Sequence, residues 1–250
     1  MNPIINKKCV SLHPFMANDY FKFRQFTVRQ DRCAMKVGTD GTLLGAWAHG
    51  GLTVLDIGTG TGLIALMMAQ RFPEAHVVGV DIDHDAIRQA RENVAASPFA
   101  ERIQLIDADI RTLQLSDLGH SPFNAIVANP PYFVDSLECP DDQRTLARHT
   151  ASLTYRELMG VVSLLLADDG EFSVVIPFDC KAGMEREAAL AGLFKVRECA
   201  VKTTPCKQPR RYLLAFSKHP ATLETTEGVI ETAPNVRSEW YQQLTKDFYL

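Results

Sequence analysis

The chain has 250 residues, an apolar fraction of 46% and a formal net charge of −4. This composition is ample for a folded core, and the negative charge excludes a protein that attracts nucleic acid through its overall charge, so an RNA substrate would need a local basic patch. No apolar run is long enough for a membrane span or a signal peptide, and we therefore expect a cytoplasmic protein.

Residues 1–50 precede the regular part of the chain. A segment that begins at Tyr20 alternates apolar and basic residues as a strand does, and a glycine-containing stretch at 36–41 leads into a predicted short helix at 42–48. We therefore predict an N-terminal extension, residues 1–50, that packs on a domain formed by residues 51–250.

Strand and helix patterns alternate from residue 52 to residue 217. The predicted strands are 52–56, 76–81, 102–107, 123–128, 171–176, 194–201 and 212–217, and the predicted helices are 61–71, 83–96, 155–167 and 181–191. This alternation predicts an α/β fold with a mostly parallel, seven-stranded sheet and helices on both faces. No helix separates the last two strands, which should form an antiparallel hairpin at one edge. A short strand at 228–232 and a final helix should complete the domain.

A glycine-rich turn, Asp56-Ile57-Gly58-Thr59-Gly60-Thr61-Gly62, follows the first of these strands. Glycines let the backbone pass close to a ligand, although any tight turn between a strand and a helix can contain them. A dinucleotide site would prefer the spacing G-x-G-x-x-G, and Asp56 would repel a pyrophosphate. A carboxylate before Gly58, Gly60 and Gly62 suits an ammonium group, which favours S-adenosyl-L-methionine over a dinucleotide as the cofactor.

Acidic residues also follow the next two strands. Asp81 lies about 20 residues past the glycines, where a carboxylate can accept hydrogen bonds from ribose hydroxyls, and Ile82 beside it can pack on an adenine. Asp83 is predicted to cap the following helix. Asp109 is predicted to accept a hydrogen bond from the adenine amino group. Each acid alone could equally serve a turn or a cap, but three in order at successive strand ends favour one cofactor site.

The tetrapeptide Asn129-Pro130-Pro131-Tyr132 directly follows the predicted strand 123–128. Asn129 offers a side-chain carbonyl, Pro130 offers a backbone carbonyl, and both can accept hydrogen bonds from one planar amine. Tyr132 can stack on the base that carries the amine, and Phe133 can form part of the same wall. The tetrapeptide therefore predicts methylation of a nitrogen. Alternatively, the two prolines form a turn and Tyr132 is ordinary packing.

The set Asp56–Gly62, Asp81, Asp109 and Asn129–Tyr132 resembles the class I S-adenosyl-L-methionine-dependent methyltransferases, in the branch with an N-P-P-Y signature that methylates amino groups. The resemblance covers about residues 52–217 and implies a Rossmann-like fold. The signature is shared by enzymes that act on adenine N6, on guanine N2 of ribosomal RNA and on glutamine side chains.

A longer match narrows the choice. Residues 23–26, 31–41, 43–47 and 248–250 resemble the bacterial tRNA(Val) adenine-N6 methyltransferases, which modify adenine 37 beside the anticodon. This resemblance implies N6-methylation of that adenine, with residues 36–40, among them Lys36, Gly38 and Thr39, in a lid over the methionine end of the cofactor. Alternatively, the glycines only mark a loop before a helix. A protein glutamine N5-methyltransferase, a ribosomal RNA guanine-N2 methyltransferase and, from another class, an NAD-dependent oxidoreductase remain the competing functions.

The predicted partner is the anticodon loop of a tRNA. The basic residues predicted to contact it lie in the loop between the last two strands and after the catalytic loop: Lys202, Lys207, Arg210 and Arg211, with Arg144 and Arg148. A solvated hairpin is the alternative for the first four. The six cysteines are scattered without a Cys-x-x-Cys pair, so we expect free thiols and no metal site. We expect a monomer or weak dimer.

Overall fold

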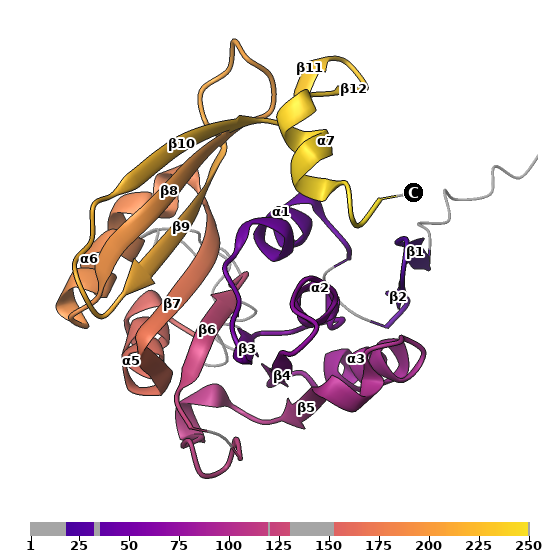
Figure 1. Ribbon diagram of the computed structural model, residues 1–250, viewed down its shortest axis with the longest axis vertical. Coiled ribbons are helices and arrows are strands. Elements are labelled where there is room, and N and C mark those ends of the chain that lie inside the picture. Colours follow the sequence, from indigo (N-terminus) through magenta and orange to yellow (C-terminus); the bar gives the residue numbers. More distant parts are fainter. Residues whose placement is uncertain (1–18, 33–35, 120, 131–152, 250) are drawn as a thin grey trace, which may run out of the picture.

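The computed structural model describes residues 19–32, 36–119, 121–130 and 153–249. An eight-stranded sheet, in the order β10-β8-β9-β7-β6-β3-β4-β5, forms the centre of the protein (Figure 1). Its strands are β3 (Thr53–Ile57), β4 (His76–Asp81), β5 (Ile103–Asp107), β6 (Phe123–Ala128), β7 (Leu166–Pro177), β8 (Phe194–Lys202), β9 (Arg211–Ser217) and β10 (Glu224–Val229). Strands β3 to β7 pair in parallel, β9 pairs antiparallel with β7 and β8, and β10 pairs in parallel with β8.

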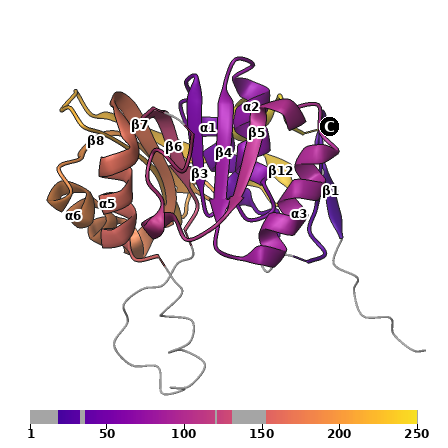
Figure 2. The ribbon, with the colours of Figure 1, turned by 90° about the horizontal axis from the view of Figure 1, so that it is seen from below.

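Helices cover both faces of the sheet, because the buried strands place successive side chains on opposite sides. Val54 of β3 packs in the same cluster as Leu66 of α2, whereas its neighbour Leu55 packs with Leu158 of α5. The helices α5 and α6 lie together over one side of the sheet (Figure 2). The helices are α1 (Thr39–Trp47), α2 (Leu63–Arg71), α3 (His84–Ala95), α5 (Tyr155–Leu165), α6 (Lys181–Leu190) and α7 (Glu239–Thr245), with short 3-10 turns η1 (Ala100–Arg102), η2 (Ile110–Thr112) and η3 (Phe178–Cys180).

The predicted α/β class and mostly parallel sheet are confirmed, but the sheet has one strand more than the seven predicted. Strand β10 covers the outer side of β8, so the antiparallel hairpin β8–β9 is not itself the edge. The first four residues of β10 are polar and exposed. An edge strand without apolar alternation resembles a loop in the sequence, which explains why the prediction placed only a short strand at 228–232.

The two ends of the described chain meet on one side of the sheet (Figure 1). The hairpin β1 (Tyr20–Lys22) and β2 (Thr27–Arg29) places Phe23 in the core, with its ring stacked 4.7 Å from Phe26 and 5.9 Å from Tyr249. Arg24 N donates a hydrogen bond to Phe248 O at 2.8 Å. A second small hairpin, β11 (Glu231–Ala233) and β12 (Val236–Arg237), precedes α7.

Asn93 of α3 joins the N-terminal hairpin to the glycine-rich turn. Its side-chain oxygen accepts a hydrogen bond from Arg29 N at 2.8 Å, and its amide nitrogen donates to Arg29 O and to Thr61 O, both at 2.9 Å. The side chain is 1% exposed, so its loss would leave several buried backbone groups without partners.

In the part of the chain that the structure describes, no helix is long and apolar enough to cross a membrane. Nor do three or more His, Cys, Asp or Glu residues of that part gather into a group that could hold a metal ion.

Replacing Asn93 by Ala should lower the free energy of unfolding by about 2–4 kcal/mol, because buried backbone groups lose their partners. Urea denaturation followed by circular dichroism measures the change. The matched control is Arg88→Ala on the exposed side of the same helix, where only an exposed pair with Asp85 is lost and the change should stay within about 0.5 kcal/mol. Equal effects of the two substitutions would contradict the bridging role of Asn93.

Candidate active site

The glycine-rich turn lies between β3 and α2 and exposes bare backbone to open space. Gly58, Gly60 and Gly62 have φ angles of 71°, 55° and 80°, a left-handed conformation that strains any residue with a Cβ. A Cβ added to Gly58 or Gly60 would meet nothing within 4 Å. The backbone conformation therefore requires these glycines, and the space above the first two is open to a ligand.

Asp56 lies beneath this turn. Its Oδ2 accepts hydrogen bonds from Thr59 Oγ1 at 2.6 Å and from Ala65 N at 3.1 Å, so the carboxylate ties the turn to the first residues of α2. The residue is fully buried, and its Oδ1 has no hydrogen-bond partner within the described residues. Burial raises the pKa of Asp56 to about 7, because desolvation disfavours the charged form.

Asp81 holds the same turn from the neighbouring strand. At the end of β4, its Oδ2 accepts a hydrogen bond from Gly60 N at 2.8 Å and its Oδ1 accepts one from Asp83 N at 3.0 Å. Burial again raises the pKa of the Asp81 carboxyl. Ile82, which follows it, keeps 48% of its surface exposed, an unusual position for a large apolar side chain. Asp83 caps α3 as predicted, accepting from Asp85 N and Ala86 N.

Asp109 is more strongly engaged than the sequence suggests. It caps η2, and both of its carboxylate oxygens accept hydrogen bonds from the Arg111 side chain at 2.6–2.9 Å. This guanidinium lowers the pKa of Asp109. Asp107, at the end of β5, accepts from His84 Nδ1 at 2.5 Å through Oδ2, whereas its buried Oδ1 has no partner among the described residues.

A cavity of about 260 Å³ lies between the glycine-rich turn and the residues that lead into α1. Predicted residues from distant parts of the chain meet on its wall: Lys36, Gly38, Thr39, Gly58, Gly60 and Asn129. Gly41 permits this arrangement, because a Cβ there would already lie 3.1 Å from the Leu63 side chain and 3.9 Å from Asn129 Nδ2. Asn129 and Pro130 directly follow β6, whereas Pro131, Tyr132, Phe133, Arg144 and Arg148 lie outside the described residues.

Arg211 differs from its predicted place on a basic surface loop. It is the first residue of β9, its side chain is 15% exposed, and it forms an ion pair with Asp40 of α1. Both residues line the cavity, so the structure separates Arg211 from the exposed cations. The ion pair between Asp40 and Arg211 was not predicted, because nothing in the local pattern indicates that α1 packs against the start of β9.

The other predicted RNA-contacting cations of this hairpin divide into two groups. Lys202 forms an ion pair with Glu227 of β10 at 2.7 Å. Lys207 and Arg210 are exposed, and within the described residues neither pairs with a carboxylate. The basic segment is thus partly neutralised by acids that are distant in the sequence.

A family described as a methyltransferase domain matches residues 48–203. A tRNA1(Val) (adenine(37)-N6)-methyltransferase from Bacteroides thetaiotaomicron is 48% identical over 238 residues, which cover 94% of this chain and 99% of that protein. The protein of the same name from Histophilus somni strain 129Pt is 43% identical over 92% of this chain and 97% of its own length.

Solved structures support the fold. A predicted O-methyltransferase from Agrobacterium tumefaciens has a TM-score of 0.64 and 18% identity, and the alignment covers 84% of this chain and 96% of that one. A glycopeptide N-methyltransferase in complex with S-adenosyl-L-methionine has a TM-score of 0.53 and 12% identity, covering 74% of this chain and 100% of that one. The Rossmann-like class predicted from the sequence is therefore confirmed.

The buried carboxyl of Asp56 should make the stability of the ligand-free protein depend on pH. Between its unfolded pKa of 3.8 and its folded pKa of about 7, the native state holds a proton that the unfolded chain has lost, so stability falls as pH rises through this window. In the wild type the free energy of unfolding should fall between about pH 5 and about pH 7.5, and Asp56→Asn should make this fall smaller by about 2–3 kcal/mol. Urea denaturation at both pH values measures it, and an unchanged loss in the variant would refute the assignment.

Proposed function

This chain belongs to the family of the tRNA1(Val) (adenine(37)-N6)-methyltransferases, and we propose that it transfers a methyl group from S-adenosyl-L-methionine to N6 of adenine 37 in a tRNA1(Val). The observation that carries the proposal is identity of 48% over nearly the whole length of both chains. We also propose a cytoplasmic location, where the tRNA substrate is found, and a monomer or weak dimer.

The residues on the cavity wall and beneath it suit S-adenosyl-L-methionine. Open backbone at Gly58 and Gly60 leaves room that a Cβ would fill, and Asp56 Oδ1 is a buried acceptor without a donor in the described chain. A buried carboxylate oxygen without a partner is costly, and an ammonium group would satisfy it. The same oxygens would repel a pyrophosphate. We infer that Asp56 holds the ammonium end of the cofactor.

The remaining predicted cofactor residues have distinct roles in this proposal. Asp81 accepts hydrogen bonds from the ribose hydroxyls while it holds the turn through Gly60, and the exposed Ile82 packs on the adenine. The methionine end is covered from the opposite wall by Lys36, Gly38 and Thr39. In this proposal the extension, residues 1–50, thus completes the cofactor site of the domain formed by residues 51–250. Asp109 remains the predicted partner of the adenine amino group. Its carboxylate would accept this hydrogen bond through lone pairs that the hydrogen bonds from Arg111 do not use.

When bound, S-adenosyl-L-methionine supplies a methyl group that its sulfonium already activates, so little general-base chemistry is required. The protein's task is to orient the target amine. Asn129 Oδ1 and the Pro130 carbonyl accept hydrogen bonds from the amine hydrogens, which favours a lone pair localised on the nitrogen. Alignment of this kind contributes about 7–11 kcal/mol in favourable cases. The predicted stacking by Tyr132 and Phe133 and the contacts of Arg144 and Arg148 rest on the sequence alone.

Labelled S-adenosyl-L-methionine and unmodified tRNA provide the decisive test. After incubation with the protein, nucleoside mass spectrometry should find N6-methyladenosine in the tRNA. The same tRNA with guanosine at position 37 is the control and should remain unlabelled. Label on a protein fraction, or N2-methylguanosine in RNA, would reject the proposed function in favour of the corresponding alternative.

Asn129→Ala should lower kcat by at least about a hundredfold, because one of two acceptors for the target amine is lost. The dissociation constant for S-adenosyl-L-methionine should stay near the wild-type value, as isothermal titration calorimetry can establish. Thermal denaturation checks that the variant is folded. Unchanged turnover in a folded variant would disprove the amine clamp.

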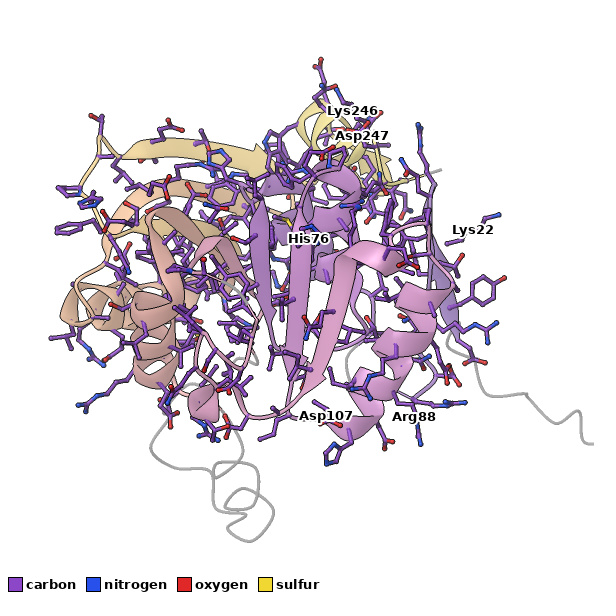
Figure 3. The ribbon with its side chains drawn as sticks, turned by 60° about the horizontal axis from the view of Figure 1, so that its bottom comes forward. Lys22, His76, Arg88, Asp107, Lys246 and Asp247 are labelled. Carbon is purple, nitrogen blue, oxygen red and sulfur yellow. The ribbon has the colours of Figure 1, made fainter. Side chains whose placement is uncertain are left out.

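Arg210→Glu should weaken tRNA binding and reduce the slope of log affinity against log salt by about 1, because a phosphate contact is lost. Lys246→Glu is the control of similar charge change. Lys246 is an exposed residue that lies at the opposite end of the protein from Asp107 (Figure 3), which ends β5 at the edge of the sheet where β7 ends and where Arg210 precedes β9. Filter binding over a range of salt concentrations measures both slopes. Parallel behaviour of the two variants would indicate only a general charge effect.

A further inference from the structure

Phe178 is an exposed aromatic residue at the end of β7. It begins the turn η3 directly after Pro177, and 48% of its surface is exposed. Its ring centroid lies 6.0 Å from the ring centroid of Tyr212, a residue that is 9% exposed. Lys181 Nζ lies 4.3 Å from the Tyr212 ring centroid. Phe178 N also donates a hydrogen bond to Arg210 O at 3.1 Å. The ring is thus supported by packed neighbours while a large part of it faces solvent.

A groove of about 580 Å³ surrounds this ring. Its wall includes an aromatic ring, two prolines and two cations: Phe178, Pro177, Pro209, Lys207 and Arg210. Among the described residues of the wall Asp179 is the single acid, so this part of the groove carries a net positive charge. A flat exposed ring beside two cations is the chemistry that binds an unpaired nucleobase and its phosphates, because bases stack on aromatic faces whatever their sequence.

The groove lies at the same edge of the sheet as Asn129. Strands β6 and β7 run in parallel with Ala128 opposite Val174, so Asn129 continues level with Val175 and Phe178 lies three residues farther on. With a strand spacing near 4.8 Å and a rise near 3.3 Å per residue, this register places Asn129 and Phe178 roughly 11 Å apart. Arg211 lines the cofactor cavity while its neighbour Arg210 lines the groove. The cofactor cavity and the groove therefore both lie at the edge of the sheet where β6 and β7 end.

We propose that Phe178 stacks on an unpaired base that neighbours the methylated adenine, while Lys207 and Arg210 bind the phosphates on either side of that base. This inference rests on the proposed function and adds a substrate-positioning residue to it. A separation of roughly 11 Å is short enough for neighbouring nucleotides of one RNA chain to contact both residues. An acidic peptide would use the two cations but would gain nothing from a flat ring, so the ring favours RNA.

The test compares Phe178→Ala, Phe178→Leu and Phe178→Tyr, with Phe194→Ala as the matched control. Phe194 is a similarly exposed aromatic residue, with 46% of its surface exposed. It starts β8 opposite Ser217, the last residue of β9, and so lies at the opposite end of the strands from Phe178. Fluorescence anisotropy with a labelled anticodon stem-loop RNA of tRNA1(Val) measures binding, and steady-state kinetics with the full tRNA separates KM from kcat. Thermal denaturation and cofactor titration show whether each variant is intact.

Phe178→Ala and Phe178→Leu should weaken RNA binding and raise KM roughly tenfold, the size expected for one lost stacking contact. Phe178→Tyr should restore both values, and cofactor affinity and the salt slope should not change, because no charge is altered. Phe178→Leu keeps an apolar side chain against Tyr212, so its result stands even where the alanine variant is unstable.

Two negative outcomes are distinguishable. The stacking proposal would be overturned if a folded Phe178→Leu variant bound RNA as tightly as the wild type, or if Phe194→Ala lost as much affinity. The proposed function would stay intact in that case, provided that the wild type methylates N6 of adenine in tRNA. Failure of the wild type to methylate tRNA would instead reject the proposed function itself. Loss of binding in both Phe178 variants, restored by Phe178→Tyr, supports the stacking contact.

Discussion

The left-handed turn between β3 and α2 is the constraint on which the site depends. Three glycines with positive φ allow it, but three polar side chains from different elements hold it in place. Asp56 bonds it from below to the start of α2, Asp81 bonds Gly60 N from β4, and Asn93 bonds Thr61 O from α3. Each hydrogen bond fixes the turn to a different element, so the open backbone at Gly58 and Gly60 is held in one conformation.

The buried position of Asp56 carries an electrostatic cost that the fold does not remove. One oxygen is satisfied by Thr59 and Ala65, while the other has no donor in the described chain, and desolvation by burial raises the pKa of Asp56 to about 7. Functional sites commonly retain such unsatisfied groups because a ligand completes them. The same residue thus stabilises the turn and, in the proposed function, selects a cationic ligand.

The cavity wall joins segments that are far apart in the chain. Residues 36–41, the glycine-rich turn, Asn129 and Arg211 all face one space, and the ion pair between Asp40 and Arg211 connects α1 to β9. The absence of a Cβ at Gly41 allows α1 to approach Leu63 and Asn129 closely. The N-terminal hairpin is in turn held by the C-terminal segment through Phe23 and Tyr249. The two ends of the described chain therefore hold each other in place.

Local patterns alone determined the helices and strands of the core, the glycine-rich turn and the cap at Asp83, because backbone preference and near-neighbour spacing produce these features. Tertiary structure decided what each polar group meets. Arg211 looked like a surface cation and instead pairs with Asp40, and β10 looked like a loop and instead extends the sheet. Phe178 gave no signal in the sequence, since exposure depends on what packs around a ring. Partners brought together by folding lie far apart in the chain, and no pattern of adjacent residues records them.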